Sequence, residues 1–114
     1  GEVLLIYAEA ANLVEGKPSA EAYEAINRVR RRAGLADLEG LDRKSFDWAV
    51  LDERSWELAF ENKRWFDICR RQLLGEVIGR YYPERQVDEH NYWMPKPHDQ
   101  FGIMTGIEQN EGYL

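Results

Sequence analysis

The chain has 114 residues, of which 44% are hydrophobic and 32% are charged, a composition typical of one globular domain. Its formal net charge of −6 argues against nucleic-acid binding, because contact with phosphates needs a concentrated basic patch. The single cysteine, Cys69, excludes an intrachain disulfide, and no stretch approaches the roughly 20 apolar residues of a membrane-spanning helix.

The first predicted element is a helix over residues 2–15, where apolar residues leave little polar face. A helix that is apolar nearly all round is expected to be buried on several sides. Gly16 follows it, at the position where helix ends favour a residue with positive φ. Because this helix begins at residue 2 without a cap, a signal peptide or an initiating Met, we expect the chain to be a segment of a longer protein. An exposed apolar face on it would then favour self-association.

The second predicted helix covers about residues 19–33, with Pro18 and Ser19 as its start signals and Gly34 as its end. The buried stripe is expected at four positions spaced four, three and four residues apart: Ala22, Ile26, Val29 and Ala33. The arginines at its end are favoured by the helix dipole. Two helices joined by so few residues predict an antiparallel hairpin, which resembles a single tetratricopeptide-type repeat.

A loop over residues 35–41 leads to Asp42, a predicted helix cap, with Leu41 and Phe46 placed to form a hydrophobic staple. The third helix is predicted from Arg43 to Leu74, a length of about 45 Å. Beyond it the sequence predicts an irregular tail with one helical turn at residues 76–80. Residues 92–97 are expected to be extended, because a residue that precedes proline avoids the α region. The predicted fold class is therefore all-α.

Four charged residues follow one face of the predicted third helix at spacings of three, four and three: Arg54, Glu57, Glu61 and Arg64. Each glutamate has an arginine three residues away, a spacing that brings side chains together on a helix. We expect these residues to form a structural ion network that holds the long helix in register. If Glu61 is buried in it, Glu61→Ala should lower stability by about 1–3 kcal/mol.

The sequence predicts no catalytic, metal or cofactor site. Glu57 and Glu61 point the same way from one helix, whereas glycosidases need two carboxyl groups that face each other across a sugar. His90 and His98 have no carboxylate or thiolate at a metal-ligand spacing. Cys69 lies on the apolar arc of the third helix and is expected to act as a small buried hydrophobe.

Aromatic residues are abundant, and two groups of them allow either packing or sugar stacking. The first group falls at helical spacing, which favours core or interface packing: Trp56, Phe60, Trp65 and Phe66. The second group lies in the predicted tail, where binding groups are more common: Tyr81, Tyr82, Tyr92 and Trp93. Packing is the favoured interpretation for both groups.

Three blocks of sequence, in order and spacing, resemble the C-terminal portion of one family. The first block joins residues 4–10 (LLIYAEA) to residues 25–35 (AINRVRRRAGL). The second comprises residues 53–54 (ER), 57–61 (ELAFE) and 64–67 (RWFD), and the third pairs residues 92–97 (YWMPKP) with residues 109–113 (QNEGY). Together they are similar to the SusD/RagB family over nearly all of residues 1–114.

The resemblance implies a surface-exposed lipoprotein of the outer membrane of Bacteroidota cells, built from tetratricopeptide-like helices. Such proteins bind glycans, or peptides in one branch, act as a lid over a SusC-like TonB-dependent transporter, and are not enzymes. The whole chain would be the C-terminal domain of a protein several times longer, and mainly scaffold. Membrane attachment would come only from a lipid anchor elsewhere, for which Cys69 is not the counterpart.

The sequence departs from the family pattern at three places. Asn62 stands where the family usually has Gly, Glu111 where it often has Pro, and residues 94–97 (MPKP) differ from the common Pro-Ile-Pro. Most glycan-contacting residues of the family lie upstream of this portion, so the resemblance assigns no ligand-binding residue here.

Two other function classes remain as alternatives. A stand-alone tetratricopeptide-like adaptor would bind a protein segment in its concave face, but such stacking normally needs at least three repeats. A glycan hydrolase would need an opposed acid pair, which the sequence does not provide.

Overall fold

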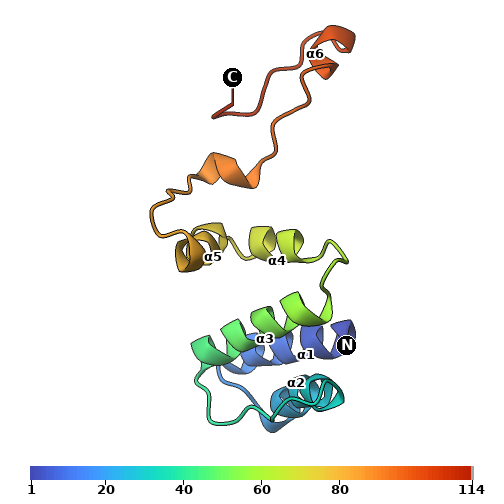
Figure 1. Ribbon diagram of the computed structural model, residues 1–114, viewed down its shortest axis with the longest axis vertical. Helices are drawn as coiled ribbons and strands as arrows, with labels where there is room; N and C mark the ends of the chain where they lie inside the picture. Colours follow the sequence, from blue (N-terminus) through green and yellow to red (C-terminus); the bar gives the residue numbers. More distant parts are fainter. Residues whose placement is uncertain (114) are drawn as a thin grey trace. The chain divides into compact units, whose positions relative to one another are not determined.

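A computed structural model of the chain describes residues 1–113, and within that range it contains helices and no strand. The predicted all-α class is therefore confirmed. The elements in chain order are α1 (Glu2–Glu15), α2 (Ala20–Arg32), α3 (Arg43–Glu57), α4 (Arg64–Arg70), α5 (Leu74–Tyr81), the 3-10 helix η1 (Glu89–Tyr92) and α6 (Gln100–Ile103) (Figure 1). The chain divides into two compact units, and the boundary lies between Asp67 and Ile68.

In the first unit, α1 packs against both α2 and α3. Figure 1 shows α1 and α3 side by side, with α2 below them. The predicted α1–α2 hairpin is confirmed, and Gly16 ends α1 in the left-handed conformation with φ 73°. Side chains from all three helices form one core, whose buried members are Leu5, Ala8, Ala22, Ala25, Ile26, Val29, Phe46 and Val50.

Helix α1 is buried along one stripe, so the expectation that several of its sides are covered is wrong for the described residues. The stripe follows the 3.6-residue period, at Leu5, Ala8, Glu9 and Asn12. Leu4 is partly buried against the core, and the other large apolar side chains of α1 are exposed: Val3, Ile6, Tyr7, Leu13 and Val14. Two neighbouring helices can cover only one side of a third, which explains the difference. Self-association through this face stays a prediction.

Helix α2 begins and packs largely as predicted. Ser19 caps it by accepting a hydrogen bond from the backbone N–H of Ala22 at 3.2 Å. Three of the four stripe positions are buried, but Ala33 is exposed because the helix ends one residue before it, and Ala25 is buried instead.

Two polar side chains of α2 hold the loop that follows it, an arrangement that the sequence did not indicate. The Asn27 amide donates to the carbonyl of Leu38 at 3.0 Å and accepts from its N–H at 2.8 Å. The Tyr23 hydroxyl forms the equivalent pair with the backbone of Leu41, at 3.2 and 2.7 Å. The loop backbone is thus satisfied without regular secondary structure. Leu38 and Leu41 pack against the core beneath it.

Asp42 caps α3 as predicted, and its carboxylate accepts a hydrogen bond from the N–H of Ser45 at 2.7 Å. Hydrogen bonding to Ser45, with the positive charge of Lys44 nearby, lowers the pKa of the Asp42 carboxyl below its ordinary value. The ionised form therefore favours the folded state.

We expect the cap to make stability depend on acidity. A carboxyl whose folded-state pKa is lowered stabilises the fold above its unfolded pKa, and that contribution is lost as pH falls through the lowered folded value. The difference in stability between the natural chain and Asp42→Ala should therefore shrink below the ordinary pKa of an aspartate. Thermal melts of both chains across acidic pH measure it, and a difference independent of pH would contradict this role.

The predicted third helix is not continuous, and its bounds of Arg43 to Leu74 are wrong. Helix α3 ends at Glu57 and α4 begins at Arg64. Between them, Phe60 and Asn62 adopt left-handed conformations with φ 66° and 58°, which a right-handed helix cannot accommodate. Asparagine tolerates this conformation better than most residues, and the family's usual Gly at position 62 was the available signal. A further left-handed residue, Gln72, precedes α5.

Phe60 should be under backbone strain, since bulky side chains rarely adopt positive φ. Phe60→Gly is expected to raise the free energy of unfolding by about 0.5–1 kcal/mol, because glycine adopts this conformation without a steric penalty. Phe60→Ala removes the same ring but keeps the strain, so it should not stabilise. Urea denaturation compares the two variants, and an equal effect of both would contradict the strain.

The second unit contains α5, η1, α6 and a tail tied by side-chain hydrogen bonds. The Gln109 side chain accepts from the N–H of Lys96 at 2.7 Å and donates to its carbonyl at 3.0 Å. Asn110 donates to the carbonyl of Met94 at 2.6 Å. The predicted helical turn at residues 76–80 falls within α5. Within residues 1–113 no helix is long and apolar enough to cross a membrane.

Candidate functional site

A buried ion pair lies where α3 ends and α4 begins. Arg54 donates through Nε to Oδ2 of Asp67 at 2.8 Å, and both side chains are only 5% exposed. Glu2 lies farther away, with its Oε1 4.0 Å from Arg54 Nη2. This pair joins α3 to α4 across a turn whose backbone hydrogen bonds are local, such as Glu61 N–H to the carbonyl of Leu58 at 3.1 Å, and it therefore helps to fix the position of the turn.

The other members of the predicted ion network have partners outside the expected ladder. Glu57 pairs with Arg32 of α2 and lies 4.0 Å from the N-terminal amino group. Arg64 donates to the carbonyl of Leu51 at 2.9 Å. Since α3 ends at Glu57, the later two members do not share its face. That the four residues stabilise the fold as one network stays a prediction.

Glu61 is exposed in the turn that follows α3. The large loss of stability expected for Glu61→Ala depended on burial of this side chain, so that loss is no longer expected. We now expect Glu61→Ala to change the free energy of unfolding by about 0.5 kcal/mol or less, as is usual for exposed positions. Thermal melting tests it. A loss of more than about 1 kcal/mol would indicate a buried interaction of Glu61 instead.

A second pair across helices was missed by the sequence reading. Arg30 of α2 donates to Oε2 of Glu53 at 2.8 Å, and the Glu53 side chain is almost fully buried. The helix dipole alone therefore does not account for the arginines at the end of α2. In the sequence, Glu53 and Glu57 are four residues apart, and Arg30 and Arg32 are two residues apart. These spacings match the two ion pairs between α2 and α3, but the match can be recognised only when it is known that the α1–α2 hairpin packs against α3.

A pocket of about 570 Å³ lies within the first unit at this turn. We call it the turn pocket; its lining is Arg54, Ser55, Leu58, Ala59, Phe60, Asn62, Lys63, Arg64, Trp65 and Phe66. Phe60 is fully exposed and Phe66 is 67% exposed. Packing of both rings was the favoured prediction, and within the described residues these two rings are not covered. The break after α3 turns them outward.

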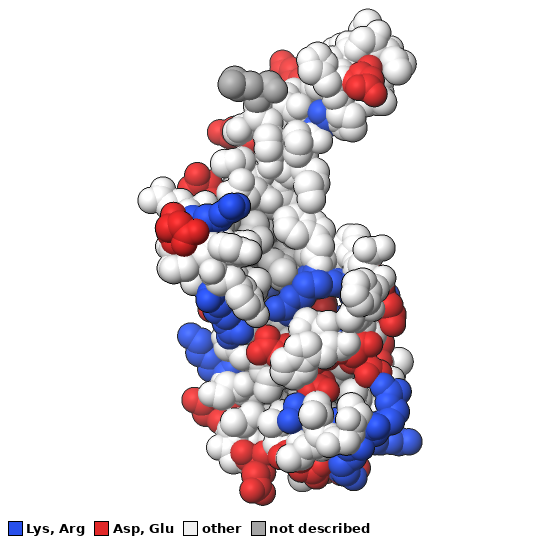
Figure 2. Space-filling model, in the orientation of Figure 1, with Lys and Arg blue, Asp and Glu red and all other residues white. Residues whose placement is uncertain are grey.

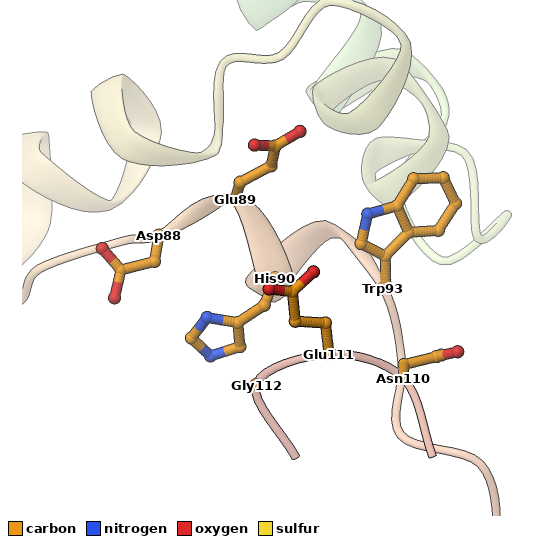
Figure 3. Close-up of a pocket in the computed structure, with 7 residues that line it drawn as sticks. All are labelled: Asp88, Glu89, His90, Trp93, Asn110, Glu111 and Gly112. Atoms are coloured by element: carbon orange, nitrogen blue, oxygen red, sulfur yellow. The ribbon is translucent and has the colours of Figure 1, made fainter. Parts of the chain in front are cut away.

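The second unit carries a separate pocket of about 610 Å³, which Figure 3 shows. It is lined by Asp88, Glu89, His90, Trp93, Asn110, Glu111 and Gly112. Several of these side chains already have structural roles: Asp88 caps η1, and the His90 ring packs edge-on against Tyr113. Trp93 points away from His90 in Figure 3. This arrangement is typical of a tail fixed by its own polar groups.

No feature of the described residues indicates a metal centre, since they contain no group of three or more His, Cys, Asp or Glu side chains that could hold an ion. Acidic and basic side chains are mixed over the first unit, which forms the lower part of Figure 2.

The fold defines a class: a helical scaffold with a tetratricopeptide-like hairpin and charged side chains that join its helices. The profile of the SusD family matches residues 1–113, and the chain belongs to that family. The sequence resemblance to the SusD/RagB family is thereby confirmed.

Two curated relatives come from Formosa agariphila. The chain is 40% identical to SusD-like protein P2 over 107 residues, which cover 84% of this chain and 21% of the relative. It is 38% identical to SusD-like protein P25 over 98 residues, which cover 82% of this chain and 17% of the relative. The chain thus spans about a fifth of the length of these relatives.

Two solved structures have the same fold over almost the whole chain. A SusD superfamily protein from Parabacteroides distasonis matches with a TM-score of 0.78 and 33% identity, covering 98% of this chain and 26% of the solved one. A SusD homolog from Bacteroides thetaiotaomicron matches with a TM-score of 0.71 and 33% identity, covering 97% and 25%.

Proposed function

We propose that the chain is part of a nutrient-binding protein that captures glycans at the outer membrane for a SusC-like TonB-dependent transporter. The observation that supports this is the match to the SusD family over residues 1–113, together with solved SusD-family structures that cover nearly all of the chain. A lipid anchor elsewhere in the longer protein would hold it at the cell surface.

Within that protein, this segment serves mainly as scaffold. Its polar side chains are largely engaged in holding helices and loops: Asn27 and Tyr23 fix the loop after α2, and Arg54 joins α3 to α4. Groups that are committed to structural hydrogen bonds are poorly placed to exchange bonds with a ligand. The bulk of the glycan contacts is therefore assigned to parts of the longer protein outside this segment.

The protein acts by binding rather than by catalysis. Three acids of the first unit, Glu53, Glu57 and Asp67, are each held by an arginine. These carboxylates are thereby engaged in joining helices. Acid–base chemistry on a glycosidic bond needs one protonated and one ionised carboxyl group that face each other.

Co-purification tests the partnership. The full-length protein that carries this chain, tagged at its C-terminus and extracted from outer membranes in mild detergent, should bring down a TonB-dependent transporter in stable proportion. An unrelated outer-membrane lipoprotein with the same tag is the control. Recovery of the tagged protein without a transporter, from membranes in which both are present, would contradict the proposal.

A further inference from the structure

The side chain of His90 takes part in a hydrogen bond whose direction is fixed by its neighbours. The backbone N–H of Asp88 donates to Oδ1 of Asn91 at 2.9 Å, so the oxygen of this side-chain amide faces Asp88. The other end of the amide, Nδ2 of Asn91, lies 3.0 Å from Nε2 of His90. An amide NH2 group can only donate, and therefore Nε2 must be the unprotonated nitrogen of a neutral ring.

Protonation of His90 removes this acceptor. An imidazolium carries a proton on both nitrogens, so Nε2 would meet the Asn91 amide donor to donor. Turning the amide over would not restore the contact, because its NH2 group would then face the N–H of Asp88. Asn91 and Asp88 form the capping box that starts η1. Histidine is the side chain that ordinarily changes charge between about pH 5 and 8, so this cap contains a group that responds to mild acid.

The charged groups around the ring indicate where the protonated side chain would find a partner. Carboxylates share its pocket from two segments of the chain: Asp88 and Glu89 at the start of η1, and Glu111 in the tail (Figure 3). The lining of this pocket contains no lysine or arginine. An imidazolium N–H group therefore has acidic acceptors available, and no cation of the lining opposes its charge.

The ring of His90 is also in contact with the end of the tail. The Tyr113 ring packs edge-on against it, with centroids 5.4 Å apart. Gly112 lies so close that a Cβ atom added there would be 2.7 Å from the Cβ of His90. A rotation of the His90 ring therefore displaces the two tail residues that pack on it.

We propose that His90 is a pH-sensitive switch that connects η1 to the C-terminal tail. In the neutral form, Nε2 accepts from Asn91 and supports the cap of η1. In the protonated form, the ring releases Asn91 and donates to a carboxylate of the pocket, and residues 112–113 move with it. Acidity thus changes the shape of the pocket in the second unit. This inference does not depend on the proposed function.

The test is a pH titration of the isotope-labelled 114-residue chain, followed by nuclear magnetic resonance. It runs from about pH 8 to 5.5, a range in which carboxyl groups with ordinary pKa values stay largely ionised. The signals followed are the His90 ring, the side-chain amide of Asn91 and the backbone amide of Asp88. The backbone amide of Tyr113 reports on the tail. All four signals should move with one common midpoint.

Two variants assign the response to one histidine. His90→Gln places an amide oxygen that can accept from Asn91 at every pH, so the transition at Asn91 and Asp88 should be lost. His98→Gln is the matched control, since His98 packs edge-on against Phe101 and does not line this pocket; the transition should be unchanged. Backbone amide spectra of both variants show whether the fold is retained.

Three results would overturn the proposal. The first is a side-chain amide of Asn91 that keeps constant chemical shifts while the His90 ring titrates. The second is a transition at Asn91 that persists in His90→Gln, since another group would then cause it. The third is loss of the transition in His98→Gln. Tyr113 signals that stay constant while Asn91 responds would contradict the connection to the tail.

Discussion

Replacing Asp67 with alanine is expected to lower the free energy of unfolding of the first unit by about 3–5 kcal/mol. The loss arises because Arg54, itself 95% buried, would keep its charge in the interior without its close partner. Glu2, at 4.0 Å and partly exposed, is too distant to replace it. Urea denaturation followed by far-ultraviolet circular dichroism measures the change.

The matched control is Asp37→Ala, which removes a carboxylate of similar contact distance from an exposed pair. Asp37 lies 3.1 Å from Arg31, and about half of each side chain is in solvent. Exposed pairs of this kind contribute little, so no measurable loss is expected. If Asp67→Ala is no worse than this control, the Arg54–Asp67 pair is not the connection between α3 and α4 that we infer.

Phe46→Ala should be comparably severe, with a loss of about 3–5 kcal/mol. Phe46 is fully buried where α1, α2 and α3 meet, and its ring packs edge-on against Tyr23 with centroids 4.9 Å apart. Removal of the ring creates a cavity that these helices cannot collapse to fill. Thermal and urea denaturation measure the loss.

Phe60→Ala deletes the same atoms at a fully exposed position and serves as the control, with an expected change of about 0.5 kcal/mol or less. A loss for Phe46→Ala that is no larger than the loss for this control would mean that the three helices do not pack around Phe46.

Capping and turn residues in the sequence predict most of the helix boundaries of the first unit. The start of α2 at Ser19 and of α3 at Asp42 follows from side-chain capping, and the end of α1 at Gly16 follows from the freedom of glycine at positive φ. These signals lie within a few residues of the structure that they specify. They can be recognised without knowledge of the tertiary packing.

The break after α3 was not found in this way, because the helical period continues through it. Phe60 and Asn62 are not glycine, and a helical wheel shows no conflict at either position. Their conformation depends on contacts made elsewhere, such as Arg54 with Asp67 and Arg64 with the carbonyl of Leu51. The turn pocket exists only because of this break, so pattern reasoning could not predict it.

The partners of the ion pairs also could not be predicted from the sequence pattern, because they depend on tertiary packing. The predicted network contained Arg54 and Glu57 of α3 but not Glu53, and it assigned them to neighbours along one helix. In the folded chain, Glu53 and Glu57 pair with Arg30 and Arg32 of α2. Partners more than 20 residues away follow from how the hairpin packs against α3.

The most direct test of the account is whether the full-length protein that carries this chain binds a glycan without altering it. Affinity electrophoresis in gels that contain a panel of polysaccharides measures retention, and chromatography of the same glycans after long incubation measures hydrolysis. The account predicts retardation by at least one polysaccharide and no released oligosaccharide. Release of products, or the absence of retardation across the panel, would contradict it.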